Sequence, residues 1–484
     1  MIAKNVLEIG AAEFLSGMTS GRNTSDGGFT TDTDKLNILT VPGVLYQPSA
    51  ITDRTTSNIN GNVVASCGDA VISSIGNDKN FVTDTARFYT YQTTTLTLRQ
   101  TGAKTYQSED TDIVQFRTDT FATSTTDIAR LIQSNLSQPD ANWESWWTVT
   151  KSKSALTAGF RHPMVVYENS LWIGDGNKLH KWDGTTATEA FLTLSTEQAI
   201  VSLGVDPSSG KMLISINESF NASDVKSSIS KVLVYNGYSN KPDKAVVVDD
   251  MVTSIYPLGG TVFMCYGQNL GYWSGVGITF LRRFKNVDLA TTSLVYKQRI
   301  TSIGQTLYVA DGLSILAYGE VSPGKKIFYY AQKVMDGQQT YVTGICNLRG
   351  ITTQGGRELG IFYEATDTYK KLASFNIDLV TGSINTGTFY SKLYRFPRPI
   401  VVREITVEYD NAVTNNSTPG TVAFIGEDLS SVVFGSIQNV SGSSEYSHYT
   451  RNSLSKKFKS LQLIYSSNIA TGIRRFLVGY DVVE

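Results

Sequence analysis

The chain has 484 residues and carries 42 Lys and Arg against 43 Asp and Glu, so its formal net charge is −1. This length exceeds the size at which one hydrophobic core usually stops growing, so we expect two or three domains. The charge balance excludes a global electrostatic attraction to nucleic acid or to an anionic membrane. Charged residues make up only 18% of the chain, and abundant Ser, Thr, Asn and Gly are typical of exposed β-structure.

Targeting signals are not evident at the N-terminus, MIAKNVLEIGAAEFL, because no basic segment is followed by a sustained apolar run. No stretch approaches 18 apolar residues, so we expect no membrane span. The three cysteines, Cys67, Cys265 and Cys346, lie far apart in apolar runs. We interpret them as buried thiols rather than as a disulfide and one free thiol. Synthesis in a reducing cytoplasm follows from these features.

Residues 1–45 are rich in Gly, Ser, Thr and Asp, as in SGMTSGRNTSDGGFTTDTD. Such a segment cannot build a core alone, so we predict an extended N-terminal arm. It holds spaced apolar anchors that could order on a neighbouring molecule: Val6, Leu7, Ile9, Phe14, Leu15 and Phe29. A plain disordered tail is the alternative.

Residues 46–390 contain a repeated pattern of short runs. The motif apolar–x–Ser–apolar recurs at Ile200–Leu203, Val252–Ile255 and Ile300–Ile303, and each copy is followed by a second apolar run: KMLISI, TVFMCY and TLYVAD. A further strand then closes on an aromatic residue and glycine, as in KWDG, VYNG, YWSG and LAYG. A period of roughly 45 residues with this order of strands predicts a β-propeller of about seven blades, with six or eight still open.

One segment interrupts this rhythm. Thr126–Ser137 places Ile128, Leu131, Ile132 and Leu136 at helical spacing, with Thr126 or Asp127 as a cap, so it predicts a short helix. The helix would pack on Trp143, Trp146 and Trp147, although three tryptophans could also form a platform for stacking sugars.

Residues 391–484 change character, because their runs are longer and alternate more cleanly, as in IVVREITVEYD. Alternation places one face inward, which predicts a C-terminal β-sandwich. Pro397 and Pro399 mark the expected boundary.

Candidate catalytic residues are few. His162, His180 and His448 are the only histidines, and we interpret His162 and His180 as structural. Paired carboxylates are the alternative basis for enzymatic activity, since propellers can place acids at a central channel for glycosidic chemistry. The candidates are Asp175, Asp311, Asp249 and Asp250. Asp175 and Asp311 lie in Asp–Gly turns, where the turn itself explains both residue types.

Two groups of acidic residues could also bind a Ca²⁺ ion: Glu109, Asp110 and Asp112, and Asp32 with Asp34. Neither group lies in an EF-hand loop or in a GGxGxD repeat. We interpret them as solvated loop acids. No P-loop and no strand-linked GxGxxG occurs. We therefore predict no catalytic, cofactor-binding or metal-binding residue and no enzymatic activity.

Basic residues form local runs: Arg282, Arg283 and Lys285; the stretch 392–403 with Lys392 and Arg403; Lys456, Lys457 and Lys459; Arg474 and Arg475. Interleaved aromatic residues could suit DNA passing a channel. We favour the simpler interpretation, in which Lys and Arg guard exposed strand edges against pairing with other chains.

A family resemblance adds to these patterns. The stretch RHPMVVYENSLWIGDGNKLHKWDG (Arg161–Gly184), the runs TLYVADG and KMLISI, and the lead-in PGVLYQPSAITDRTT (Pro42–Thr56) resemble propeller-bearing virion proteins of tailed bacteriophages. Those proteins occupy the neck, tail or nozzle. The resemblance implies a structural virion component, made in the host cytoplasm and assembled with sister subunits and other virion proteins. It transfers no catalytic residue.

Two other functions stay open. One is a receptor-binding or glycan-degrading tail protein that applies a propeller face to a host-surface glycan or receptor. The other is a cytoplasmic scaffold propeller from a cell, which the missing signal and the low charge do not distinguish from a virion protein.

Overall fold

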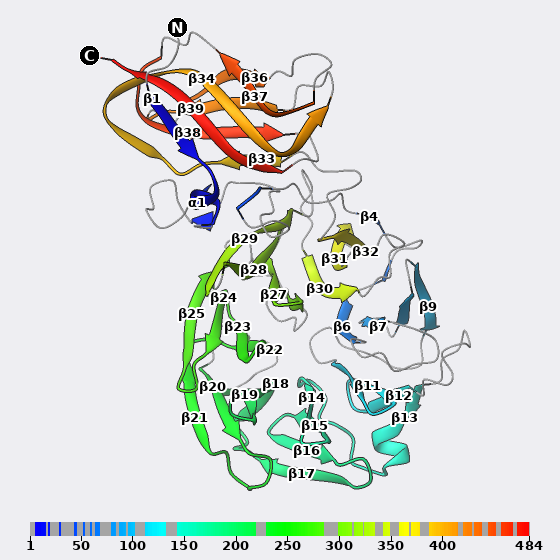
Figure 1. Ribbon diagram of the computed structural model, residues 1–484. Helices are drawn as coiled ribbons and strands as arrows, with labels where there is room; N and C mark the ends of the chain where they lie inside the picture. Colours follow the sequence, from blue (N-terminus) through cyan, green and yellow to red (C-terminus); the bar gives the residue numbers. More distant parts are fainter. Residues whose placement is uncertain are drawn as a thin grey trace. The chain divides into compact units, whose positions relative to one another are not determined.

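We analysed a computed structural model of the chain (Figure 1). The residues it describes are 5–15, 18–19, 29–30, 43–45, 52–53, 59–60, 63–67, 79–83, 87–92, 95–101, 112–131, 143–218, 229–284, 299–311, 314–322, 324–333, 342–348, 358–366, 369–377, 387–414, 420–427, 430–437, 444–451, 456–467 and 472–483. The contacts divide the chain into two compact units. One unit comprises Thr52–Leu313 and Gly337–Ser374, and the other comprises Met1–Ile51, Ser314–Asp336 and Phe375–Glu484.

The first unit is built from four-stranded antiparallel sheets whose strands pair in chain order, as the blades of a β-propeller do, and the last of these sheets also includes two strands from the stretch Ser314–Asp336. Figure 1 shows these sheets following one another around the unit. The first three are β6 (Val63–Cys67), β7 (Lys79–Thr83), β8 (Arg87–Gln92) and β9 (Thr95–Thr101); β10 (Ile113–Phe116), β11 (Asp119–Thr123), β12 (Ile128–Leu131) and β13 (Trp143–Ser145); and β14 (Met164–Tyr167), β15 (Ser170–Asp175), β16 (Lys178–Trp182) and β17 (Ala187–Thr193).

The next sheets repeat the same order. They are β18 (Gln198–Asp206), β19 (Lys211–Glu218), β20 (Ser230–Tyr235) and β21 (Lys244–Val248); β22 (Val252–Leu258), β23 (Thr261–Tyr266), β24 (Asn269–Trp273) and β25 (Ile278–Arg283); and β26 (Ile300–Ile303), β27 (Thr306–Asp311), β28 (Ser314–Ser322) and β29 (Lys325–Lys333). A five-stranded sheet joins β30 (Val342–Leu348), β31 (Glu358–Thr366) and β32 (Tyr369–Asn376) to β4 (Thr52–Asp53) and β5 (Ile59–Asn60).

The all-β class and the propeller arrangement predicted from the sequence are therefore confirmed. The described residues form six four-stranded sheets of this kind, while the count of about seven blades stays a prediction. The three copies of the Ser-containing motif are the first strands β18, β22 and β26, and the runs that follow them are the second strands β19, β23 and β27.

Neighbouring blades approach one another closely at two glycines. A Cβ atom on Gly174 in β15 would lie 2.8 Å from Cγ2 of Ile200 in β18, and one on Gly204 would lie 2.3 Å from Cγ2 of Ile255. Both distances are too short for real carbon atoms, so glycine is required there. Continuous apolar clusters fill the space between blades, and one of them joins Trp172 of the third sheet to Ile214 and Tyr235 of the fourth.

The second unit contains an eight-stranded sheet whose order differs from the chain order. Its path is β1-β39-β34-β38-β35-β36, with β33 also paired to β38 and β37 to β34. The bounds are β33 (Gly387–Tyr390), β34 (Tyr394–Thr414), β35 (Gly420–Ile425), β36 (Ser431–Ile437), β37 (Ser444–Arg451), β38 (Phe458–Ser467) and β39 (Ile473–Val482). The long strand β34 pairs with β38 near its start and with β37 and β39 further along.

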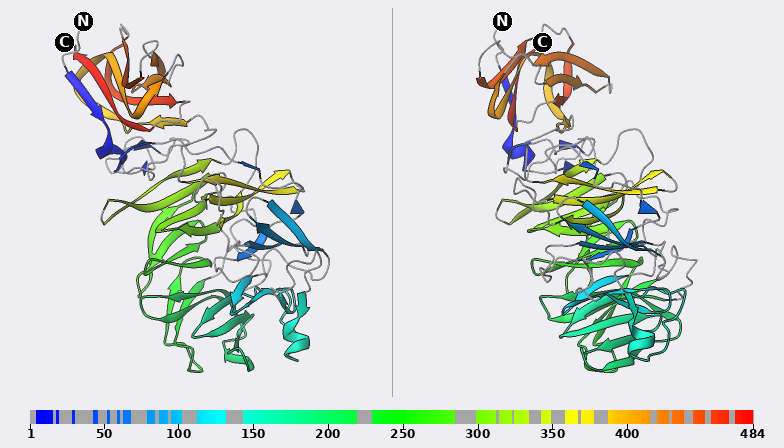
Figure 2. Two further views of the ribbon diagram at one scale, coloured as in Figure 1. Left: turned by 45° about the vertical axis from the view of Figure 1, so that its right-hand side comes forward. Right: turned by 90° about the vertical axis from the view of Figure 1, so that its right-hand side faces the viewer.

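The chain's N-terminal segment is part of this sheet. Strand β1 (Asn5–Ile9) pairs antiparallel with β39, and the blue and red strands lie side by side in both views of Figure 2. A helical turn, α1 (Ala11–Phe14), follows it. Further along, β2 (Met18–Thr19) and β3 (Phe29–Thr30) pair in parallel, and Leu45 bridges Ile473. Residues 5–15 thus dock within the same chain, which their composition did not predict.

The predicted helix over Thr126–Ser137 is wrong where the structure describes it. Residues 128–131 form strand β12, paired with both β11 and β13, because its neighbours offer two complete ladders that a helix could not use. Residues 132–142 lie outside the described part of the chain. Among the described residues that follow, Trp146–Thr150 form a π-helical turn. Within the described ranges, no helix is both long and apolar enough to span a bilayer.

Candidate functional site

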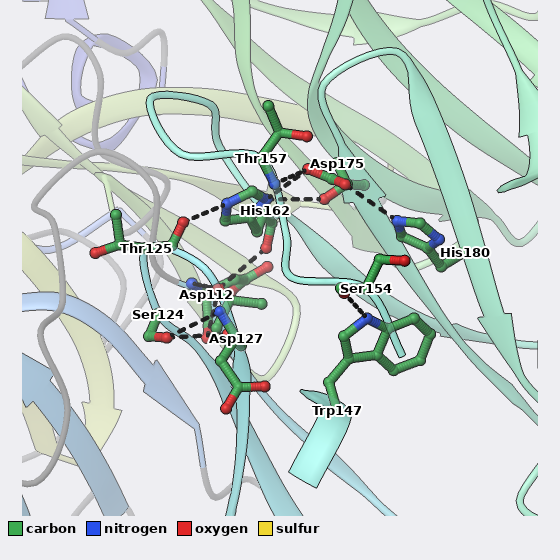
Figure 3. Close-up of polar contacts among 12 residues, drawn as sticks. Asp112, Ser124, Thr125, Asp127, Trp147, Ser154, Thr157, His162, Asp175 and His180 are labelled. Atoms are coloured by element: carbon green, nitrogen blue, oxygen red, sulfur yellow. Dashed lines mark hydrogen bonds and ion pairs between the residues drawn. The ribbon is translucent and has the colours of Figure 1, made fainter. Parts of the chain in front are cut away.

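Two of the three histidines meet one carboxylate between the second and third blades (Figure 3). His162 directly precedes β14, Asp175 is the last residue of β15, and His180 lies in β16. The hairpin between β14 and β15 and the hairpin between β15 and β16 bring the three side chains together, although 18 residues separate the two histidines in sequence. We call these residues the histidine cluster.

His162 faces hydrogen-bond acceptors on both sides of its ring. Its Nδ1 lies 3.3 Å from the carbonyl oxygen of Gly174 and 3.7 Å from Oδ1 of Asp175, and its Nε2 lies 3.3 Å from the carbonyl oxygen of Thr125. A protonated ring would satisfy both sides. Burial nevertheless lowers the pKa of His162 from its ordinary value and outweighs the attraction of Asp175.

His180 has a defined tautomer. Its Nδ1 accepts a hydrogen bond from the backbone N–H of Ala190 at 3.0 Å, so the proton lies on Nε2, which donates to Oδ2 of Asp175 at 3.3 Å. The register of β16 and β17 shifts between Leu179 and Lys181, so His180 lies at an irregular point of the ladder. The His180 ring also packs 5.3 Å from that of Trp147.

Asp175 accepts hydrogen bonds from both directions, since the backbone N–H of Thr157 donates to its Oδ1 at 2.7 Å. Burial alone would raise the pKa of Asp175, but the hydrogen bonds from His180 and Thr157 and the two nearby histidines outweigh it and lower the pKa. The carboxylate therefore stays ionised and serves as the centre of the cluster.

Asp112 links the same two blades at a second point. Its Oδ1 accepts from the N–H of Ile113 at 2.9 Å, and its Oδ2 accepts from the N–H of Met164, the first residue of β14, at 2.9 Å. The hydroxyl of Thr123 donates to the carbonyl oxygen of His162 at 3.1 Å. Asp112 was a calcium candidate in the sequence, and the structure gives it this inter-blade role.

The cluster is closed to any substrate, because His162 is 0%, Asp175 3% and His180 4% exposed. A catalytic base must reach the proton that it removes, and this enclosure prevents such contact. This burial and the hydrogen bonds within the protein support the interpretation of His162 and His180 as structural. Within the described residues, no group of three His, Cys, Asp or Glu side chains is arranged to hold a metal ion.

The remaining acidic candidates are dispersed. Asp311 ends β27 and is buried, while Asp249 and Asp250 follow β21. Oδ1 of Asp250 accepts from the N–H of Met251 at 2.8 Å, and burial raises the pKa of Asp250. The other acidic candidates, Asp32, Asp34, Glu109 and Asp110, lie outside the described residues, and so does the side chain of His448.

The tryptophans and cysteines are core residues where they are described. Trp146 and Trp147 are fully buried, and Trp146 packs edge-on against Phe121 and Trp182 at 4.9 Å and 4.5 Å, so the packing interpretation is confirmed for both. Cys265 and Cys346 are buried free thiols. Burial raises the pKa of Cys265 to about 11, which makes it unreactive. The side chains of Trp143 and Cys67 lie outside the described residues.

Arginines of the C-terminal basic runs form ion pairs with carboxylates of neighbouring strands. Arg403 pairs with Asp481 at 2.9 Å, Arg474 with Asp410 at 2.9 Å, and Arg475 with Glu408 at 2.7 Å. Such pairing supports the structural interpretation over a nucleic-acid surface. The lysines 456, 457 and 459 line a cavity of about 240 Å³ together with Glu427 and Pro399. Lys285 lies outside the described residues.

Inter-blade hydrogen bonds also use residues that the sequence did not single out. The hydroxyl groups of Tyr256 and Ser302 lie 2.9 Å apart and join the fifth and sixth blades, and the amide of Asn347 donates to the carbonyl oxygen of Ser302 at 3.3 Å. Ser302 belongs to the repeated Ser-containing motif. The recurrence of Ser at the same position in the first strand of three blades was the available signal for this role.

No protein-family model matches the sequence, and a search of curated proteins finds no match. Among solved structures, the chain is similar to the computationally designed Ika8 protein, with 9% sequence identity and a TM-score of 0.37. That similarity covers 66% of this chain and 99% of the designed protein.

Proposed function

We propose that the chain is a non-enzymatic structural component of a bacteriophage virion, located in the neck, tail or nozzle. Its activity is assembly with sister subunits and other virion proteins, after synthesis in the host cytoplasm. The sequence resemblance over Arg161–Gly184 and the neighbouring runs suggests the class. The observation that carries the non-enzymatic part is the enclosure of the histidine cluster, whose polar side chains are taken up by hydrogen bonds within the protein, among them the contact of His162 with Thr125 of the neighbouring blade.

Exposed apolar side chains support an assembly role. Val247 lies on β21, the outer strand of its sheet, and is 62% exposed; Phe280 lies on the outer strand β25 and is 57% exposed. Val276, in the turn before β25, is 74% exposed. An outer strand has backbone N–H and C=O groups along its free edge that can pair with another chain. Exposed apolar side chains on such a strand add surface that contact with another protein would bury.

The finer architecture is part of this proposal. The five-stranded sheet would be a seventh blade, since β30 contacts β26 and β27 on one side and β6 on the other. Strand β4 from the start of the propeller would then close the ring on β32. In the C-terminal unit, β34 pairs with β38 and then with β37 and β39, which suits a strand shared between the two sheets of a sandwich.

Particle composition tests the proposal directly. Purified virions should contain the chain in several copies, detected by quantitative mass spectrometry, and it should stay with the neck and tail after the DNA is released. Its absence from particles would overturn the assignment. The purified chain should also show no turnover on surface polysaccharides, chromogenic esters or DNA. Turnover abolished by substituting an acid pair would favour the alternative, a glycan-degrading tail protein.

A further inference from the structure

We infer that residues 5–15 form an exchangeable docking segment, and that the edge of β39 accepts this segment from a second copy of the chain. The inference rests on the proposed assembly function and names its partner as the sister subunit. It concerns a surface within the C-terminal unit, where β1 and α1 contact β39 and β33.

The acceptor is a strand edge that the segment covers. Residues 476–480 of β39 pair with β1, and Ile473 exchanges backbone hydrogen bonds with Leu45 at 3.0 Å and 2.8 Å. The other side of β39 is already paired with β34. Without β1, the backbone N–H and C=O groups that point to this edge from alternate residues of 476–480 would be unpaired, and an edge of that kind pairs readily with a strand of another chain.

An aromatic anchor gives the acceptor its specificity. Phe14 is fully buried, and its ring lies 5.5 Å from Phe389 and 6.4 Å from Phe476, which stack on each other at 5.3 Å. Two further features restrict what fits. Nη1 of Arg475 donates to Oε1 of Glu8 at 3.2 Å, and a Cβ atom on Gly10 would lie 2.9 Å from Cβ of Arg475. The acceptor therefore recognises a strand, a glycine and a turn that ends in Phe.

Exchange needs no new interface. The second copy's segment would make the same ladder, the same aromatic contacts and the same ion pair, which is why swapping a terminal element is a low-cost route to oligomers. Residues 16–42, which contain four Gly and three Ser, connect the segment to Gly43. Whether the segment docks on its own chain or on a second copy depends on the effective concentration of each acceptor edge near the segment. Intramolecular docking prevails in dilute solution, and exchange increases when copies are held together.

Disulfide trapping between two differently tagged copies tests the inference. One full-length copy carries Asn5→Cys and the other carries Tyr480→Cys, because Asn5 and Tyr480 are direct partners in the β1–β39 ladder. Opposed residues of an antiparallel pair lie about 4.5–5.5 Å apart, which a disulfide can span. The matched control pairs Asn5→Cys with Val433→Cys on β36, an exposed position at the other end of the sheet path.

Mixed disulfide dimers should form in the first pair, increase with protein concentration and exceed those of the control pair at least tenfold. Adding Phe14→Ala to the Asn5→Cys copy should reduce them severalfold, whereas Val6→Ala, at an exposed position, should not. If the Asn5→Cys/Tyr480→Cys double variant forms only intrachain disulfides at every concentration, the inference is wrong. Incorporation of that locked variant into virions would leave the proposed function intact, and absence of the wild-type chain from virions would overturn the function alone.

Discussion

The blades and the C-terminal sheet are built from the same kind of strand but differ in how far apart in sequence their partners lie. Each blade pairs its strands in chain order, and β14 to β17 occupy only residues 164–193. The C-terminal sheet pairs residue 5 with residue 480, and Glu8 contacts Arg475 across 467 positions. A local pattern can reveal the first arrangement, and it contains no information about the second.

Removing residues 1–15 should have the largest effect, and it should be confined to the C-terminal unit. The change withdraws the buried side chains of Ile9 and Phe14 and uncovers the edge of β39. Losing two buried side chains of this size costs on the order of 5 kcal/mol, enough to unfold a marginally stable domain. Limited proteolysis with mass spectrometry should show cleavage within 387–483 while 143–283 stays protected. Deleting residues 1–4 alone is the control. Equal protection of both regions after removal of residues 1–15 would show that β1 and α1 do not stabilise the C-terminal sheet.

Trp146→Ala should lower the free energy of unfolding of the propeller by about 3–5 kcal/mol and leave the stability of the C-terminal sheet unchanged. Trp146 is fully buried against Phe121, Trp147 and Trp182, so its removal leaves a large cavity between the second and third blades. Chemical denaturation followed by fluorescence and proteolysis measures the loss. Val149→Ala lies in the same π-helical turn at a position 69% exposed and should change stability by less than about 0.5 kcal/mol. Similar losses for both variants would refute the packing role of Trp146.

The difference between strand partners that are close in sequence and partners that are distant also explains which elements the sequence predicted. The first three strands of several blades carried the repeated motifs, but the outer strands β21 and β25 are largely exposed and lack a regular apolar pattern. The false helix over 126–137 arose because Ile128 and Leu131 have helical spacing, while pairing with β11 and β13 decides their conformation. Asp127, expected to cap that helix, accepts the N–H of Thr148 in the π-helical turn instead.

The candidate site was predictable only in part. Asp175 was explained as a turn residue, and the structure adds two histidine contacts that depend on the pairing of three strands. Asp112 bonds Met164 across 52 positions of sequence, which no spacing rule indicates. The contacts of Phe14 with Phe389 and Phe476 were equally hidden in the sequence. The apolar character of Phe14 indicated that it would be buried, but no sequence pattern indicated which residues would cover it.

Asp112→Ala should cost about 1–3 kcal/mol, because it leaves the buried N–H groups of Ile113 and Met164 without their acceptor. This loss is smaller than that for Trp146→Ala, since no large apolar volume is removed. Thermal unfolding monitored by circular dichroism, which should also show a β-dominated spectrum, measures the change. Glu197→Gln alters an exposed acid on the same unit and serves as the control. A neutral Asp112→Ala variant would mean that the link between the second and third blades does not stabilise the propeller.

Mild acid should produce the smallest loss of stability, and protonation of His162 on unfolding should account for much of that loss in the propeller. Burial lowers the pKa of His162 in the folded state below 6.5, so the unfolded chain binds more protons as the pH falls through that value. The contribution of neutral His162 is therefore complete above pH 6.5 and declines below it, by at most about 1.4 kcal/mol per pH unit. The lowered pKa of Asp175 acts in the same direction at lower pH, below its ordinary value of 3.8. Melting temperature measured from pH 8 to pH 5 should fall in the wild type and fall less steeply in His162→Asn, whose amide cannot titrate. An identical slope in both proteins would show that other groups control the acid sensitivity, and the histidine cluster would then be a fixed packing element that does not respond to pH.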